Sequence, residues 1–78
     1  MPRFFLHIRD GESLIPDEEG SDLPSLDAAR QEALQGARDI LAEKVRLGEP
    51  LDGETIEISD EGGHLLDVVR FRDAIRLT

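Results

Sequence analysis

The sequence contains no cysteine, and this absence removes two kinds of site at once. No disulfide can hold the chain together, and no thiolate can bind a metal ion. Proteins without disulfides are usual in reducing compartments, so we expect a cytoplasmic protein. A chain of 78 residues buries only about 60% of its unfolded surface. We therefore expect its stability to come from a well-packed core or from self-association.

Long hydrophobic runs are also missing. The apolar run near the N-terminus is interrupted by His7 and Arg9 and is too short for a signal peptide. No stretch approaches the ~20 apolar residues of a membrane-spanning helix. We expect a single small domain over residues 1–78 that does not contact a membrane.

Basic residues are missing from two long stretches. The chain has a net charge of −9, and residues 10–27 and 49–67 each carry seven acids and no lysine or arginine. An acidic protein repels phosphate backbones, so we predict no binding to nucleic acid. A solubilising surface is the simplest explanation of the acid runs. The alternative is a surface that contacts a basic partner.

The clearest signal that is present is an amphipathic helix, predicted from Ser25 to Leu47. Its apolar residues fall in one sector when successive residues are placed ~100° apart. They are Leu26, Ala29, Ala33, Leu34, Ala37, Ile40, Leu41 and Leu47. Ser25 is a suitable N-cap, and Gly48 followed by Pro50 is a suitable stop. The alanines would let the helix lie close against a sheet.

Four strands are predicted around this helix from the alternation of apolar and polar residues. They cover residues 3–9, 13–15, 55–59 and 64–71. Turn signals at Asp10-Gly11 and at residues 60–63 predict two hairpins. The expected fold is a ββαββ two-layer α+β sandwich, a four-stranded sheet with one long helix on one face. We expect the strand order second, first, fourth, third, and a final helical turn or a tail held by Ile75 and Leu77.

The sheet face away from the helix is expected to be uncovered and partly apolar. Phe5, His7 and Arg9 share it by alternation, together with either Leu65 or Leu66. The predicted helix spans roughly 34 Å, whereas strands of this length span only about 17–26 Å. The uncovered face and the overhanging helix both favour a homodimer.

An acidic loop precedes the helix and could supply oxygen ligands for Ca²⁺ or Mg²⁺ through Asp17, Glu18, Glu19 and Asp22. The spacing differs from that of an EF-hand loop. If Gly20 were the central glycine, an isoleucine would occupy the first ligand position. We predict no metal and no cofactor. Acids before a helix also favour its partially positive N-terminus, which gives the loop a structural explanation.

The remaining polar residues do not form a catalytic pattern. His7 and His64 would approach each other only if the first and last strands were neighbours, and we treat them as separate surface side chains. No strand–turn–helix nucleophile elbow is present. The arginines of the two terminal segments would form one basic patch if those segments paired. Ordinary ion pairing along the strands is the simpler explanation.

Pro2 permits one enzymatic hypothesis. Removal of the initiator methionine would leave a secondary amine, which acts as the general base in the small tautomerases. The opening PRFFLHIRDG resembles theirs in having a proline, a short strand and a turn. That family then runs into a helix, whereas a hairpin follows here. We keep a tautomerase-like enzyme with Pro2 as its base as an alternative.

Several ordered segments together resemble a known family. MPRFFLHIRDG, IPDEEGSDLPSLDAARQEA, GEPLDG, SDEGG and VVRFRDAIRL are similar to an uncharacterised family of small domains of unknown function, abundant in rhizobia-like alphaproteobacteria. The resemblance covers nearly the whole chain. It implies a stand-alone cytoplasmic bacterial domain of this length, and it implies no activity, cofactor or catalytic residue.

The preferred functional prediction is a small acidic, non-enzymatic interaction module. We expect it to form a homodimer, and another protein is a candidate further partner. Its predicted contact surface combines Phe5, His7 and Arg9 with the acids Asp17, Glu18, Glu19 and Asp22. Besides the tautomerase-like enzyme, a regulatory acidic mimic that binds a basic protein is the remaining alternative.

Overall fold

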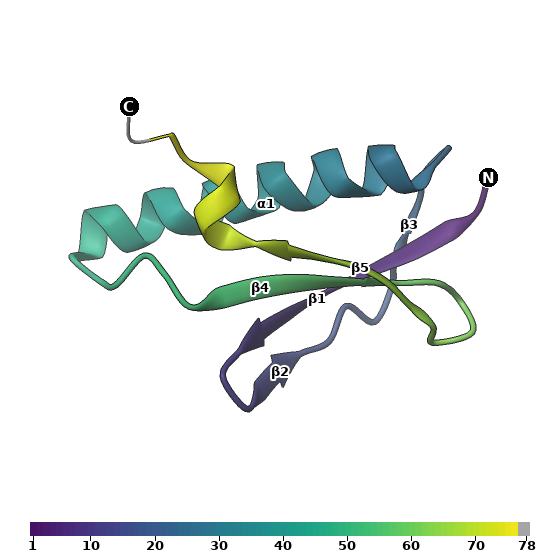
Figure 1. The fold of residues 1–78 in the computed structure, drawn as a ribbon, viewed down its shortest axis with the longest axis horizontal. Coiled ribbons are helices and arrows are strands. Elements are labelled where there is room, and N and C mark those ends of the chain that lie inside the picture. Colours follow the sequence, from purple (N-terminus) through teal and green to yellow (C-terminus); the bar gives the residue numbers. More distant parts are fainter. Residues whose placement is uncertain (77–78) are drawn as a thin grey trace.

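The computed structural model describes residues 1–76 (Figure 1). The elements in chain order are β1 Arg3–Asp10, β2 Ser13–Ile15, β3 Ser21–Asp22, α1 Leu26–Leu47, β4 Glu54–Ser59, β5 Leu65–Arg70 and the 3₁₀ helix η1 Phe71–Ala74. The described part of the chain is therefore α+β, with one long helix and a five-stranded antiparallel sheet. The expected helical turn after the last strand is η1, while the expected contact of Leu77 lies outside the described residues.

The sheet has one strand more than the sequence predicted. Ser21 and Asp22 pair antiparallel with Phe4 and Arg3 at the start of β1. A strand of two residues is too short to show any alternation, so its pattern could not be read. β2 and β3 thus border the same side of β1. Residues 16–20, which we call the acidic connector, join them along this side.

The strand order is β2-β1-β4-β5, with β3 also beside β1. The predicted order, which placed the last strand beside the first, is wrong. β4 takes the central position next to β1. Its Ile56 and Ile58 are 3% and 0% exposed, as suits a central strand. β5 is at the edge, and its Leu65, Leu66 and Val68 remain exposed.

The helix begins and ends where its capping residues predict. Ser25 Oγ accepts a hydrogen bond from the Ala28 N–H at 3.1 Å. Gly48 adopts a φ of 73°, and the N–H groups of Gly48 and Glu49 donate to the carbonyls of Val45 and Lys44. This pair of bonds is the Schellman motif, in which a glycine readily takes the left-handed conformation. The predicted bounds of the helix are confirmed.

The core lies between α1, η1 and the inner faces of β1, β4 and β5. Its buried apolar residues are Phe4, Ala29, Ala33, Ala37, Leu41, Ile56, Ile58, Val69, Phe71 and Ala74. The helix contributes mainly alanines, so it approaches the sheet closely. In Figure 1 it runs along β5 and β4, whereas β2 lies on the far side of the sheet. Arg38 Nε donates to the Ala74 carbonyl at 2.9 Å and fixes η1 on the helix.

Candidate interaction surface

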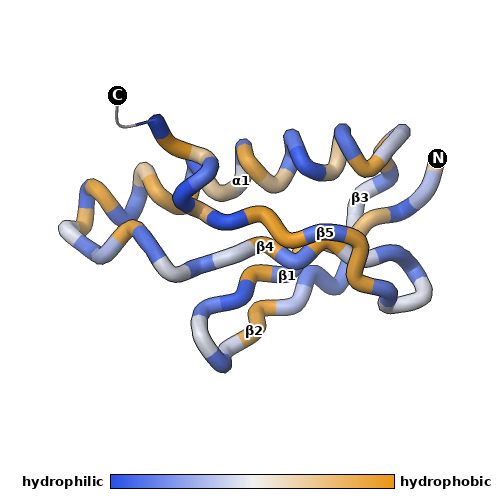
Figure 2. Tube along the Cα trace, viewed as in Figure 1, coloured by the Kyte–Doolittle hydropathy of each residue, from blue (hydrophilic) through white to orange (hydrophobic). Residues whose placement is uncertain are grey.

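Three rows of side chains cross the sheet on the face away from α1, because paired residues of neighbouring strands point to the same side. The rows are Phe5-Ser59-Leu65, His7-Glu57-Val68 and Leu14-Arg9-Thr55-Arg70. We call these ten residues the outer sheet face. Figure 2 shows hydrophobic stretches along β5, the strand that contains Leu65 and Val68. The structure thus brings Phe5, His7 and Arg9 together on one surface, as their alternation predicts.

A β-bulge decides which leucine belongs to this face. Asp67 lies opposite Ile58, but the next residue of β4, Ser59, lies opposite Leu65. Leu66 is therefore the extra residue of the bulge. Both leucines are exposed, Leu65 by 59% and Leu66 by 40%. The sequence left the choice open, and the register gives the paired position to Leu65.

Aromatic side chains form the N-terminal part of the outer sheet face. The rings of Phe5 and His7 stack with their centroids 6.3 Å apart and their planes 14° from parallel. Ser59 lies between Phe5 and Leu65 in its row and is buried at 7% exposure. Ser59 thus lies on the face away from α1 and is nevertheless buried between these two larger side chains.

One ion pair lies across the middle of the face. Arg9 Nε donates to Glu57 Oε2 at 2.9 Å, along the diagonal between β1 and β4. The hydrogen bond from Arg9 lowers the pKa of Glu57, and the same bond raises the pKa of Arg9. The pair neutralises itself, so the outer sheet face carries apolar side chains around a balanced charge. Val68, next to Glu57 in its row, is 43% exposed.

Asp17 ties the acidic connector to the side of β1. Its Oδ2 accepts from the Leu6 N–H at 3.1 Å, and its Oδ1 accepts from the Gly20 N–H at 3.1 Å. Its own N–H donates to His7 Nδ1 at 3.0 Å. Asp17 therefore accepts from the Leu6 N–H of β1, a donor that pairs with neither β2 nor β3. The sequence carried one local signal of this role, an aspartate three residues before a glycine, because an aspartate can accept from the N–H three residues on, as it does at a helix N-cap.

Arg3 binds both the acidic connector and β3, which follows it. Its Nε and Nη2 bind the two carboxylate oxygens of Asp22 at 3.1 and 3.2 Å. Its Nη1 donates to the Glu19 carbonyl at 2.7 Å. The carboxylates of Glu18 and Glu19 form no ion pair within residues 1–76. Of the four acids predicted for this surface, Asp17 and Asp22 thus have structural partners, while Glu18 and Glu19 are exposed.

Gly20 lets the connector lie directly against β1. Its φ is 73°, and a Cβ at this position would lie 2.9 Å from Phe5 Cε2 and 2.9 Å from Arg3 Cγ. It would also lie 3.0 Å from the Phe4 carbonyl oxygen, which belongs to the backbone and cannot move aside. Only glycine fits both the conformation and the space.

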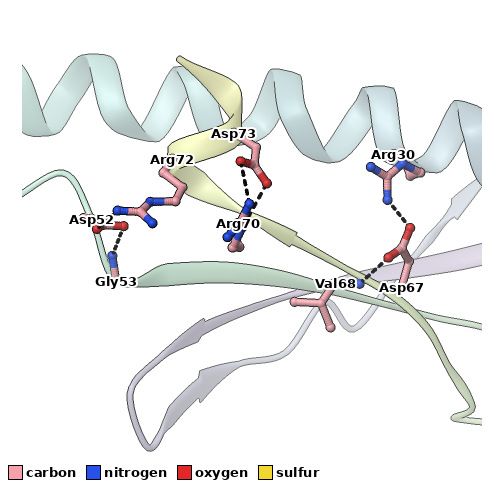
Figure 3. Close-up of polar contacts among 8 residues, drawn as sticks. All are labelled: Arg30, Asp52, Gly53, Asp67, Val68, Arg70, Arg72 and Asp73. Atoms are coloured by element: carbon pink, nitrogen blue, oxygen red, sulfur yellow. Dashed lines mark hydrogen bonds and ion pairs between the residues drawn. The ribbon is translucent and has the colours of Figure 1, made fainter. Parts of the chain in front are cut away.

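A second aspartate closes the opposite side of the sheet, and the sequence did not reveal it. Asp67 Oδ1 accepts from the Val68 N–H at 2.8 Å, and Asp67 Oδ2 pairs with Arg30 Nη1 from the helix. Figure 3 shows Arg30 reaching from α1 to this carboxylate. These bonds lower the pKa of Asp67, with the contribution of Arg30 the largest.

A family described as a domain of unknown function, DUF6894, matches residues 3–72. The chain belongs to this family. No curated protein and no solved structure matches the chain. The matched residues run from the start of β1 into η1, so the DUF6894 region contains the whole sheet, the acidic connector and α1. No helix within residues 1–76 of this DUF6894 protein is long and apolar enough to cross a membrane.

The other residues considered for chemistry lie apart in the DUF6894 fold. Pro2 is exposed, and its carbonyl accepts from the Leu23 N–H at 3.0 Å. A groove of about 410 Å³ is lined by Leu51, Asp52, Arg72, Asp73 and Ile75, and Pro2 is not among these residues. No group of three or more potential metal ligands is found within residues 1–76.

The two histidines and the terminal arginines have separate partners. His64 lies in the β4–β5 turn beside Asp60, with Nδ1 3.1 Å from Oδ1, whereas His7 contacts the connector. The conditional basic patch does not form, because β1 and β5 are not neighbours. Four arginines each pair with a different carboxylate: Arg3 with Asp22, Arg9 with Glu57, Arg70 with Asp73 and Arg72 with Asp52. Figure 3 shows the last two pairs.

Proposed function

We propose that this protein is a non-enzymatic interaction module that forms a homodimer through its outer sheet face. The observation that carries the proposal is that α1 covers one face of the sheet, whereas the opposite face keeps exposed apolar residues. Leu65 and Val68 are 59% and 43% exposed there, in the same rows of the sheet as Phe5 and His7. Exposed apolar residues gathered on one uncovered face are typical of contact surfaces.

The amount of exposed surface supports a second copy as the occupant. The chain exposes 5305 Å², whereas a compact monomer of this mass exposes about 4,700 Å². The chain therefore exposes about 600 Å² more than a compact monomer of its size. The molecule is also only 17 Å thick along its shortest axis, because it has two layers. A second copy on the outer sheet face would give the sheet the cover that it lacks.

The charges favour association at this face over the acidic parts of the surface. The Arg9–Glu57 pair is already formed within one chain, so burying it leaves no unpartnered charge. Each chain carries a net charge of −9, so two copies repel each other at long range. Added salt screens this repulsion. The homodimer should therefore become tighter as the salt concentration rises.

Analytical ultracentrifugation of matched variants tests the proposal. Val68→Glu places a carboxylate in the contact and should weaken the dimer by about tenfold or more. Val45→Glu is the control, because Val45 is 63% exposed on the far end of α1. It should sediment like the wild type. A wild-type protein that is only monomeric at micromolar concentration would overturn the proposal, and so would equal weakening by both variants.

A further inference from the structure

His7 takes part in a hydrogen bond that only one protonation state allows. The Asp17 N–H donates to His7 Nδ1 at 3.0 Å. A ring nitrogen that accepts a hydrogen bond carries no proton, so the ring proton is on Nε2 and the imidazole is neutral. Protonation of Nδ1 would turn this acceptor into a donor that faces another donor.

We propose that His7 is an acid-sensitive latch, which holds the acidic connector on β1 while neutral and releases it when protonated. The latch lies entirely within one chain, so it does not rest on the homodimer. Histidine is the side chain that ordinarily changes charge between about pH 5 and pH 8, which makes release possible under mild conditions.

The bond to His7 supports the other two bonds of Asp17. The same residue that donates to the ring also caps the Leu6 N–H and closes the turn at Gly20. Loss of the bond from the Asp17 N–H to His7 frees the backbone of Asp17. The side chain of Asp17 is then no longer held in position to accept from Leu6 and Gly20. Release would leave the Leu6 N–H without its partner, on the side of β1 that faces away from β4. This part of β1 would then be open to pairing with another extended segment.

Charged groups around the His7 ring favour its turning away from the Asp17 N–H once it is protonated. Glu57 lies opposite His7 on β4, and Asp17 lies beside it in the connector. Arg9 shares the face with His7 but is held by Glu57 at 2.9 Å. A protonated ring could turn toward either carboxylate, which gives the cation a favourable alternative to its place against the Asp17 N–H. The His7 ring also stacks with Phe5, with the ring centroids 6.3 Å apart.

Hydrogen exchange followed by NMR tests the latch directly. We expect the protection factor of the Asp17 amide to fall about tenfold between about pH 7.5 and about pH 5.5, after correction for intrinsic exchange. The amides of Leu6 and Gly20 should lose protection with it. In His7→Asn an amide oxygen can accept from the Asp17 N–H without titrating, so protection should stay constant over this range. His64→Asn is the matched control and should respond like the wild type.

Two results would overturn the latch. One is constant protection of the Asp17 amide in the wild type, and the other is an equal loss in His7→Asn. Should His7→Asn fail to fold, the ¹⁵N signals of the wild-type imidazole decide the matter. At about pH 7.5 they should show the proton on Nε2 and an accepting Nδ1, and a proton on Nδ1 would contradict the proposal.

Discussion

The two sides of the sheet are each closed by an aspartate, but the closures differ in origin. On the β1 side, Asp17 comes from the connector and caps the Leu6 N–H. On the β5 side, Asp67 belongs to the strand itself and caps the next N–H along, that of Val68. By alternation from the β4 pairing, the Val68 N–H points to the free edge. Unpaired strand donors invite pairing with other chains, and both aspartates reduce this hazard.

The difference lies in what surrounds each aspartate. The β1 side is covered by a polar segment that Arg3 clamps through three hydrogen bonds. Among the described residues, no segment covers the β5 side in this way, and the exposed apolar residues there are Leu65, Leu66 and Val68. The acidic connector covers the β1 side. On the β5 side Asp67 caps a single N–H group, and the surface around it is apolar. Part of the acid excess is thus structural, because Asp17, Asp22 and Asp67 are all bonded.

The largest loss of stability should come from a substitution that prevents the acidic connector from packing against β1. Gly20→Ala combines a positive φ with a clash against the Phe4 carbonyl oxygen. We expect it to lower the free energy of unfolding by about 3 kcal/mol. Gly11→Ala is a matched control, because Gly11 has a φ of 60° but nothing within 4 Å of the added Cβ. It should cost only about 1 kcal/mol in urea unfolding. Equal costs would show that close packing of the connector does not stabilise the protein.

Removing the cap on the β1 side should have the next largest effect. Asp17→Ala leaves the Leu6 and Gly20 N–H groups without their acceptor. We expect a loss of about 2 kcal/mol in unfolding free energy, since part-buried donors lose their partners. Glu18→Ala, one residue along the connector, should change stability by less than about 0.5 kcal/mol. A similar loss in both variants would contradict the assignment of Asp17 as the cap.

Removing the cap on the β5 side should cost less, because Asp67 and Arg30 are partly solvated. We expect Asp67→Asn to lose about 1 kcal/mol at neutral pH. The pKa of Asp67 in the wild type is lowered in the folded state. Its contribution to the free energy of unfolding is therefore present above the unfolded pKa of about 3.9 and is lost as the pH falls through the folded pKa. The stability difference between wild type and variant should therefore shrink below about pH 4. A difference that grows on acidification would contradict this sign.

The smallest effect should come from Glu18 and Glu19, whose carboxylates form no ion pair within residues 1–76. Reversing both charges with Glu18→Lys and Glu19→Lys should change the free energy of unfolding by less than about 0.5 kcal/mol, since both side chains are exposed. Thermal unfolding at low and high salt measures this. If stability and self-association both stay unchanged, these two acids serve solubility. A large stabilisation would instead show that the acid run strains the connector.

The local part of the fold was predictable because its signals are local. The helix repeats its apolar residues at helical spacing and carries its own caps at Ser25 and Gly48, so its bounds follow from the sequence. The order of the last two strands does not, because both are short and alternation within a strand does not say which strand it pairs with. It depends on the burial of Ile56 and Ile58 against the helix and on the bulge at Leu66, which are properties of the packed sheet.

The candidate surface shows the same division. Alternation within one strand was enough to place Phe5, His7 and Arg9 on one face. The roles of Asp17 and Asp67 were not predictable in this way. The first requires the connector to fold back on β1, and the second requires Arg30 to reach across from the helix. Such contacts join residues far apart in the chain, and the short pattern around Asp17 records only its local bond to Gly20.

The pairing of β1 with β4 has a consequence for the time course of folding. Its partners are 44 to 54 positions apart, from Asp10 with Glu54 to Phe5 with Ser59. The hairpins β1–β2 and β4–β5 and the helix can form from neighbouring residues, but the centre of the sheet must wait for this long loop to close. Neither hairpin has a complete core before then. We expect the meeting of the two hairpins to limit the folding rate, and both to melt in one transition.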